Sequence, residues 1–155
     1  EIHQVWGQPC QLSIVEKDQA PFVELDHTRM ILYVRPGTDM GKRREIVEMW
    51  RREQVKKAAL PLIAKWELVM GVKVAKVSVR RMKTRWGSCS HIKRSIRLNT
   101  SLSAKAPELL EYVVVHELAH ILEPSHNGRF AALMEQFLPD WRKLRKTLNQ
   151  RVEQT

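Results

Sequence analysis

The apolar positions of the N-terminal third follow the short, alternating pattern that is typical of β-strands. This pattern predicts strands over residues 10–15, 22–25 and 29–34, and the last of these is the strongly β-prone run Arg-Met-Ile-Leu-Tyr-Val. The intervening Asp26-His27-Thr28 can turn the chain between the last two strands. We therefore expect a small β unit before any helix.

Pro36-Gly37 interrupts the strand pattern, and a long helical pattern follows it. From residue 40 to about residue 70, apolar side chains recur near three- and four-residue intervals, as on the buried face of a helix. Thr38 or Asp39 can cap the first turn, and Gly71 can end the last one. Pro61 lies inside and cannot donate a backbone hydrogen bond, so we expect the helix to kink or restart there.

Two more strands precede the C-terminal helices. Alternating Val and polar residues predict a half-buried strand over 72–79, and a second strand is expected over 95–98. The segment between them contains Thr-Arg-Trp-Gly-Ser-Cys-Ser over 84–90, which we interpret as a loop with an embedded aromatic residue.

Prolines delimit the helices of the C-terminal third. Pro107 suits the first turn of a helix that runs through Leu122, and Pro124 ends it because the residue before a proline is pushed out of the helical region. Helical spacing of apolar residues then predicts one helix around 130–138 and a final basic amphipathic helix from 141 to 152. The whole pattern predicts a single α+β domain over residues 1–155.

The composition is that of a globular domain and favours a protein that does not cross a membrane. The chain has 155 residues, of which 43% are hydrophobic and 28% charged, as in ordinary globular domains. No run approaches 18 apolar residues and the first residues do not resemble a signal peptide, so we expect no membrane association and a cytoplasmic protein. Cys10 and Cys89 are far apart and form no C-x-x-C pair, so we expect two reduced thiols.

Positive charge is concentrated in one segment. The formal net charge is +10, and Lys73–Arg97 contains nine basic residues and no Asp or Glu. Such a segment attracts polyanions, which makes nucleic acid a possible partner, although an ordinary solvated face has the same composition. The nine are Lys73, Lys76, Arg80, Arg81, Lys83, Arg85, Lys93, Arg94 and Arg97.

The sequence His116-Glu117-Leu118-Ala119-His120 carries the clearest chemistry. Residues four apart share one face of a helix, so both imidazoles can reach one ion, and zinc accepts neutral histidine nitrogen as a ligand. Glu117 is rotated by about 100° from His116, where it would flank the metal and take a proton from the attacking water. The flanking residues are apolar, and a metal would offset the cost of burying these polar groups.

A third ligand is expected because catalytic zinc sites hold three protein ligands and keep one position open. His126 lies six residues after His120, beyond the break at Pro124, where the chain can fold back toward the ion. This spacing matches that of the metzincins, although Glu123 stands at their glycine position and no Met-turn is evident. The rival third ligands are Glu123, Glu135 and Asp140, whereas His3, His27 and His91 are expected at the surface.

Two kinds of supporting residue are expected near such a site. An acceptor should hold the second ring nitrogen of each histidine, and the candidates are Glu111, Asn99 and Asn127. A donor should stabilise the oxyanion that forms during hydrolysis. The candidates for that role are Arg85, Tyr112 and Arg129.

Several blocks of the sequence resemble a known family. The blocks are Lys-Thr-Arg-Trp-Gly-Ser-Cys-Ser at 83–90, Ile-Arg-Leu-Asn at 96–99, Tyr-Val-Val-Val-His-Glu-Leu-Ala-His at 112–120, and Ser-His-Asn to Phe at 125–130. In this order they resemble the YgjP-like metallopeptidases, which are zincins related to the SprT-like and WLM proteins. The resemblance runs from about Gly7 to Leu148.

The resemblance carries its own expectations for fold and site. It implies a minimal zincin (minigluzincin-like) fold, with a small mixed β-sheet, a long helix behind it, the metal-binding helix and a following helix. It also implies that His126 is the third zinc ligand and that an N-terminal β segment of the family is absent here. Ser125 and Ala131 stand where the family often has Asn and Trp, departures that leave the metal site intact and concern substrate contacts.

These observations favour a zinc-dependent metallopeptidase that acts on a protein or peptide substrate, with Glu117 as general base. One alternative keeps the metal but hydrolyses nucleotides or phosphoanhydrides, and another is a DNA-associated protease of the SprT-like type. A structural zinc module is the third possibility, but it would need four protein ligands where three are evident.

Overall fold

The computed structural model describes residues 1–150 and begins with a four-stranded sheet. Its strands are β1 (Ile2–Val5), β2 (Gln8–Glu16), β3 (Phe22–Asp26) and β4 (Arg29–Val34), in the spatial order β1-β2-β4-β3. The three predicted strands are confirmed, with β2 longer than expected, whereas β1 was not predicted. The β3–β4 hairpin turns at His27 and Thr28, as expected, and His27 adopts a left-handed φ of 54° there.

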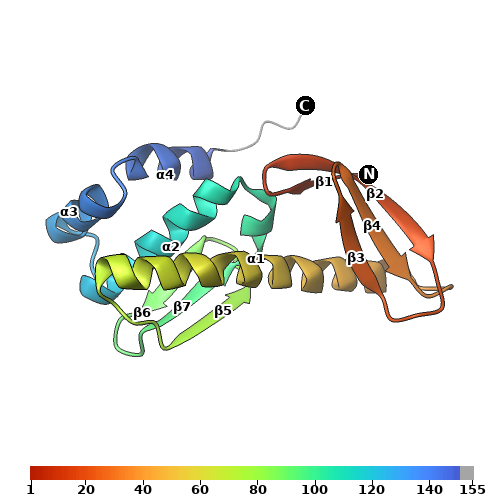
Figure 1. The fold of residues 1–155 in the computed structure, drawn as a ribbon, viewed down its shortest axis with the longest axis horizontal. Helices are drawn as coiled ribbons and strands as arrows, with labels where there is room; N and C mark the ends of the chain where they lie inside the picture. Colours follow the sequence, from red (N-terminus) through yellow and green to blue (C-terminus); the bar gives the residue numbers. More distant parts are fainter. Residues whose placement is uncertain (151–155) are drawn as a thin grey trace.

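Helix α1 (Met40–Met70) spans 31 residues and connects the two ends of the molecule (Figure 1). Asp39 is its cap, since the side chain accepts a hydrogen bond from the Lys42 N–H, and Gly71 ends the helix in the left-handed conformation at φ 67°. The predicted limits are therefore confirmed. The restart expected at Pro61 is wrong, because the helix continues through this residue and its buried face runs on to Met70.

A second, three-stranded sheet follows α1. It contains β5 (Lys76–Arg80), β6 (Gly87–Ser90) and β7 (Ser95–Asn99) in the order β5-β7-β6, with β5 parallel and β6 antiparallel to β7. The strand predicted over 72–79 begins only at Lys76. The loop predicted over 84–90 is wrong in its second half, which forms the edge strand β6.

The C-terminal third is helical. A short 3₁₀ helix, η1 (Thr100–Ala104), leads into α2 (Pro107–Leu122), α3 (Gly128–Phe137) and α4 (Trp141–Asn149). The predicted helices are confirmed, except that η1 was not foreseen and the expected extension of the last helix to Val152 lies outside the described residues. Helix α2 is buried along most of its length and packs against α1, β6, α3 and α4 (Figure 1).

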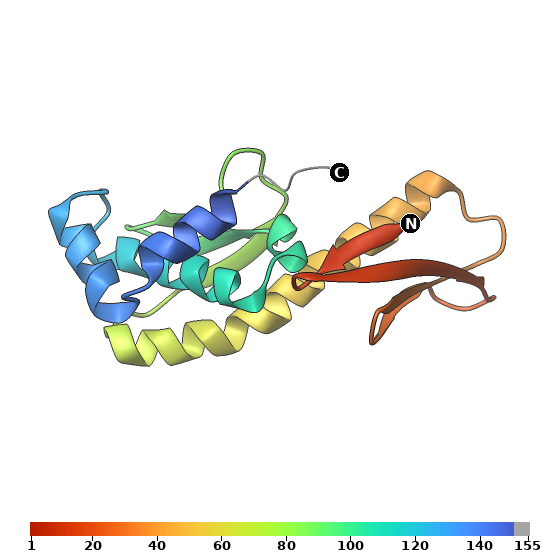
Figure 2. The same cartoon turned by 90° about the horizontal axis from the view of Figure 1, so that it is seen from above.

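The first sheet sits at one end of α1, and the second sheet with α2–α4 surrounds the other end (Figure 2). The β1–β2 turn joins the two parts, because the Trp6 N–H donates to the Ser103 carbonyl (2.7 Å) and the Gly7 N–H donates to the Ala104 carbonyl (3.0 Å). Trp6 also packs against the hydrophobic core on both sides of this junction.

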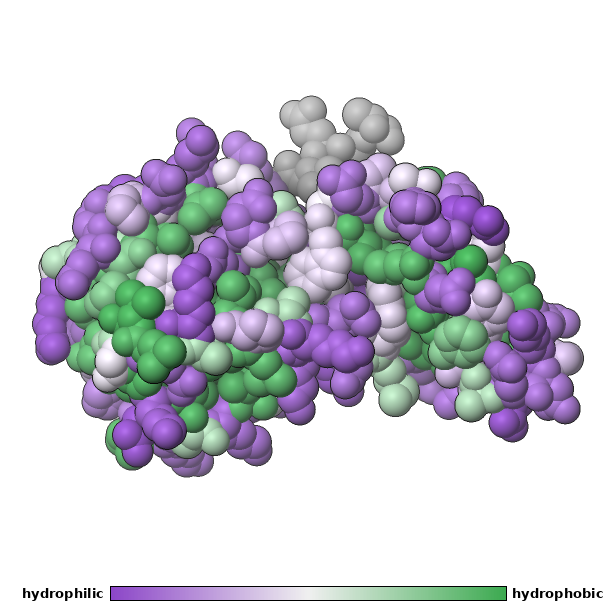
Figure 3. Space-filling view, viewed as in Figure 1, coloured by the Kyte–Doolittle hydropathy of each residue, from purple (hydrophilic) through white to green (hydrophobic). Residues whose placement is uncertain are grey.

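The outer face of α1 is partly apolar. Figure 3 shows green surface over the half of α1 that is nearest the second sheet, in agreement with the exposure of Leu60, Leu68 and Val69. Even so, no helix within residues 1–150 combines the length and apolar character needed to cross a membrane.

Candidate metal centre

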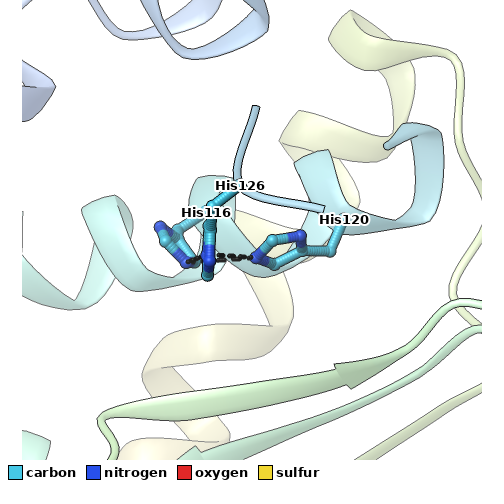
Figure 4. Close-up of side chains that lie close together, drawn as sticks. All are labelled: His116, His120 and His126. Atoms are coloured by element: carbon cyan, nitrogen blue, oxygen red, sulfur yellow. Dashed lines mark hydrogen bonds between the residues drawn. The ribbon is translucent and has the colours of Figure 1, made fainter. Parts of the chain in front are cut away.

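Helix α2 presents two histidines from a buried position. Its side chains are apolar on nearly every side, and Val114, Val115, Leu118 and Ala119 have no exposed surface. His116 and His120 lie one turn apart and project in the same direction, as Figure 4 shows. The helix is thus fixed by packing all round, which holds the two imidazoles in place.

The segment between α2 and α3 brings in the third histidine. Its conformation is set by two side-chain hydrogen bonds, from the Ser125 N–H to the Glu123 carboxylate (3.0 Å) and from the Phe130 N–H to the Asn127 side chain (3.1 Å). The chain therefore folds back after α2, and His126 points toward the other two imidazoles (Figure 4). The Phe130 ring lies against all three, stacked on His120 at a centroid distance of 4.5 Å.

The three Nε2 atoms converge on one point. They lie 2.9 Å (His120–His126), 3.3 Å (His116–His120) and 3.4 Å (His116–His126) apart. Ligand atoms about 2.0–2.1 Å from a tetrahedral zinc ion are themselves separated by about 3.3 Å. Three neutral imidazoles cannot satisfy one another at such distances, so this donor set fits a metal ion, and these are the residues that could hold one.

The surroundings keep the imidazoles in the neutral form that binds metals. Burial, together with the neighbouring His120 and His126, lowers the pKa of His116 to about 3. Burial also lowers the pKa of His120. Both rings are therefore ready to act as ligands at neutral pH without losing a proton.

The second ring nitrogens have other partners than we expected. His120 Nδ1 lies 3.1 Å from the Glu123 carbonyl oxygen, and the buried Nδ1 of His116 has no hydrogen-bond partner within residues 1–150. Of the three expected acceptors, Glu111 bonds Trp66 and Lys65, Asn99 bonds the 82–85 backbone, and Asn127 caps α3. The orienting group at His120 is a backbone carbonyl.

Glu117 lies beside the histidine cluster in an apolar setting. Its Oε2 is 4.0 Å from His116 Nε2, and the residue is only 5% exposed. Burial raises the pKa of this carboxyl to about 8, against an opposing effect of Arg85. A carboxyl with a pKa in this range can accept and return a proton near neutral pH, and a cation bound nearby would lower the value.

A cleft of about 430 Å³ opens above these groups. Two of the predicted oxyanion-stabilising residues, Arg85 and Tyr112, line it, and burial raises the pKa of Tyr112 to about 12, so that its hydroxyl remains a donor. Arg129 is not among the lining residues and instead lies 3.7 Å from the Glu123 carboxylate. Strand β6 forms one wall of the cleft and α4 another.

Helix α4 contributes cleft residues that the sequence did not single out. Arg145 and Asn149 both line the cleft, and the Asn149 side chain accepts a hydrogen bond from the Trp86 indole at 3.0 Å. The sequence placed both residues on a basic amphipathic helix. An amphipathic pattern does not show which part of the protein the helix packs against, so their place in the cleft could not be predicted.

The remaining candidates contribute no side chain to the ligand cluster. Glu123, Glu135 and Asp140 contribute no atom to it, and Glu135 pairs with Trp141 and Arg142. Cys10 and Cys89 are free thiols, as expected, and Cys89 lines the cleft without joining the ligand group. His91 is exposed as predicted, yet its Nδ1 lies 3.3 Å from the His120 carbonyl oxygen.

Comparison with known proteins bears on both fold and family. Residues 1–151 match the profile of a family described as YgjP-like, metallopeptidase domain. No curated protein matches the chain by sequence. The metallopeptidase zymogen abylysin of Pyrococcus abyssi is similar in structure, with a TM-score of 0.52 and 20% identity over 57% of this chain and 89% of its own. The zymogen jannalysin of Methanocaldococcus jannaschii gives a TM-score of 0.50 and 19% identity, over 61% of this chain and 92% of its own.

These similarities confirm the predicted fold class. The chain has a small mixed α+β fold like that of minimal zincin metallopeptidases.

Proposed function

Because the chain belongs to the YgjP-like metallopeptidase family, we propose that it is a zinc-dependent peptidase in which His116, His120 and His126 hold the metal and Glu117 acts as general base. The observation that carries this proposal is the convergence of three Nε2 atoms within 3.4 Å beside a buried carboxyl. A bound zinc ion supplies Lewis acidity toward a carbonyl oxygen and toward water.

Glu117 has the position and environment for proton transfer. It extends from the same helix as the ligands but from a different side, so its carboxyl stands next to the cluster without belonging to it. In the proposed mechanism it takes the proton of the attacking water and returns it to the leaving amine. Its raised pKa suits both transfers near neutral pH.

The cleft also offers a place for an extended peptide. Strand β6 is at the edge of its sheet, so one side of its backbone has no strand partner there, and Gly87, Ser88 and Cys89 line the cleft. We propose that substrate pairs with this edge as an added strand, with the scissile bond over the histidines. The Tyr112 hydroxyl and the Arg85 guanidinium are the proposed donors to the developing oxyanion.

The test compares two substitutions with one control on the same helix. Glu117→Gln should retain stoichiometric zinc but lower kcat by about 10²- to 10⁴-fold, the usual contribution of a general base. His116→Ala should lose both the metal and turnover. Glu108→Gln, at an exposed position in the first turn of α2, should leave zinc content and peptide hydrolysis unchanged.

Zinc content by metal analysis and turnover of a mixed peptide library are the two readouts, with nucleoside triphosphates as a second substrate panel. Arg85 and Arg145 could also hold a phosphate, so hydrolysis of nucleotides but not of peptides would support the phosphoanhydride alternative. Equal turnover with and without stoichiometric zinc, or full activity of Glu117→Gln, would contradict the proposed mechanism.

A further inference from the structure

The outer face of the β5-β7-β6 sheet is built from cations and serines. In this sheet, Val79, Ile96 and Leu98 point into the core, so the alternate residues point outward. Strand register places the outward residues in two rows across the three strands. The rows are Ser78–Arg97–Ser88 and Lys76–Ser95–Ser90.

The positive charge of this region is not neutralised within the described chain. All nine basic residues of the segment Lys73–Arg97 are exposed. Within residues 1–150 only Arg81 forms a salt bridge, with Glu48, and the other eight have no carboxylate partner. Most of the net positive charge of the chain therefore lies on this sheet and its loops, since the basic residues elsewhere are nearly balanced by acidic ones.

This face is also hollowed. A groove of about 540 Å³ runs over it, with Lys76, Lys93 and Arg97 among its lining residues, together with the hydroxyl groups of four serines and no Asp or Glu. Lysine, arginine and serine side chains are the usual donors to phosphate oxygens of nucleic acids. We propose that the outer face of the β5-β7-β6 sheet binds the phosphate backbone of double-stranded nucleic acid without sequence preference.

The composition of the face favours a duplex over other polyanions. Proteins that hold single strands stack bases on aromatic side chains, whereas the outward rows contain only Ser, Lys and Arg. Trp86, which precedes β6, lines the cleft of the metal centre instead, where its indole donates a hydrogen bond to Asn149. Stable docking on a membrane needs an apolar anchor in addition to a basic patch, and Ile92 at the β6–β7 turn is a single exposed apolar residue.

The proposal goes beyond peptidase activity, because binding at this face requires neither the metal nor Glu117. Fluorescence anisotropy with a labelled duplex of mixed sequence, at several salt concentrations, measures it directly. The unaltered chain should bind with a Kd on the order of 1–100 μM at physiological salt, and the affinity should fall steeply as salt rises. The variant Lys76→Gln/Lys93→Gln/Arg97→Gln should reduce the slope of log K against log salt by about 3.

A matched control removes the same charge from the other end of the molecule. Lys17→Gln/Arg29→Gln/Arg35→Gln alters three exposed cations of the first sheet and its flanks, and should leave the slope nearly unchanged. Circular dichroism of both variants reports whether they remain folded. An equal reduction in both variants would overturn the proposal, and so would tighter binding of the single strand, of polyglutamate or of phosphatidylserine vesicles than of the duplex.

The outcome can be separated from that of the proposed function. The groove variant should hydrolyse a short uncharged peptide as fast as the unaltered chain, since its three substitutions lie outside the residues lining the catalytic cleft. Duplex binding without any peptide hydrolysis would contradict the proposed peptidase activity but not the proposed duplex-binding face. Peptide hydrolysis without salt-sensitive duplex binding would contradict the proposed duplex-binding face but not the proposed peptidase activity.

Discussion

His116, Glu117 and His120 stand together in the apolar helix α2, and His126 joins them from the segment that follows. Grouping these polar side chains has a physical cost. Burying neutral histidines without partners and a carboxyl with a raised pKa is unfavourable in isolation. Another favourable interaction must offset this free-energy cost. Coordination of a metal ion by the three convergent nitrogens would provide one. The polar residues of α2 are thus better explained by chemistry than by folding.

Gly87 controls how closely β6 can approach Glu117. A Cβ at this position would lie 3.0 Å from Glu117 Oε2, 3.0 Å from Val113 Cγ1 and 3.1 Å from the Arg97 carbonyl oxygen. Gly87→Ala should therefore displace the carboxyl and lower kcat/KM about ten- to a hundredfold, because small misplacements of a catalytic group are costly. Zinc content should not change.

The control for this substitution is Gly128→Ala at the start of α3, where a Cβ would meet nothing within 4 Å. It should leave turnover unchanged and make unfolding slightly harder, since alanine favours a helix over glycine. Peptide-hydrolysis kinetics and metal analysis on both variants check the expectation. Unaltered kinetics in Gly87→Ala would mean that Glu117 does not depend on the absence of a side chain on β6.

For individual residues, the sequence was most informative where the position of a side chain follows from the spacing of a helix. His116, Glu117 and His120 follow from one motif on one helix, and the break at Pro124 indicated where His126 could return. The orienting partner of His120 could not be foreseen, because it is the backbone carbonyl of Glu123 and every residue has one. Arg145 reaches the cleft only through the packing of α4, which no local pattern shows.

Among the elements, those with strong local signals were predicted well. Helix α1 has a capping Asp39, a terminal Gly71 and a regular buried face, and its limits followed from them. Strand β6 was missed because Gly-Ser-Cys-Ser has little β-propensity, and the strand is held by antiparallel pairing with β7. Strand β1 has only four residues, too short a run to stand out in the sequence, and it pairs antiparallel with β2.

Helix α4 places a second guanidinium in the cleft, that of Arg145, in addition to that of Arg85. Neither Arg85 nor Arg145 forms a salt bridge within the part of the chain that the structure describes. We expect the enzyme to prefer peptides with an acidic residue near the scissile bond. Arg145→Gln should lower kcat/KM about tenfold for such a peptide, the effect of losing one partly solvated, charge-assisted hydrogen bond.

Two comparisons isolate this effect. The same peptide with Gln in place of Glu should show little difference between Arg145→Gln and the unaltered enzyme. Lys143→Gln removes one positive charge from an exposed position of the same helix that does not line the cleft, and should leave both peptides unaffected. A similar loss for the acidic and the amide peptide would show that Arg145 supports the fold of the cleft and does not select substrate charge.

At the scale of the whole molecule, α1 carries one sheet at one end and the half with the histidine cluster at the other, and a few polar contacts fix the junction. The buried Arg51 of α1 donates to the Ser103 hydroxyl of η1 at 3.0 Å, and Arg81 joins Glu48 of α1 to Ser101 of η1. The 3₁₀ helix η1 is therefore the point where α1, β1 and the path into α2 meet. Its position was not predictable, because it depends on contacts between segments that are far apart in sequence.

The β1–β2 turn tests how strongly the two ends depend on each other. Gly7 has a φ of 81°, and a Cβ there would lie 3.2 Å from both N and Cα of Ala106, just before α2. Gly37 has a similar φ of 83° but nothing within 4 Å of the position of a Cβ. Gly37→Ala should therefore lower the free energy of unfolding by about 1–2 kcal/mol, the cost of the left-handed conformation alone.

Gly7→Ala should lower the free energy of unfolding by more than Gly37→Ala does, because its new methyl group would also push the turn away from the backbone just before α2. The free energy of unfolding from urea titrations of both variants gives the difference, and zinc content at low temperature reports on the metal centre. We expect zinc to be retained, since the histidines are held by α2 and by the segment before α3. Equal losses in the two variants would mean that the close approach adds nothing, and the first sheet would then contribute to stability through α1 alone.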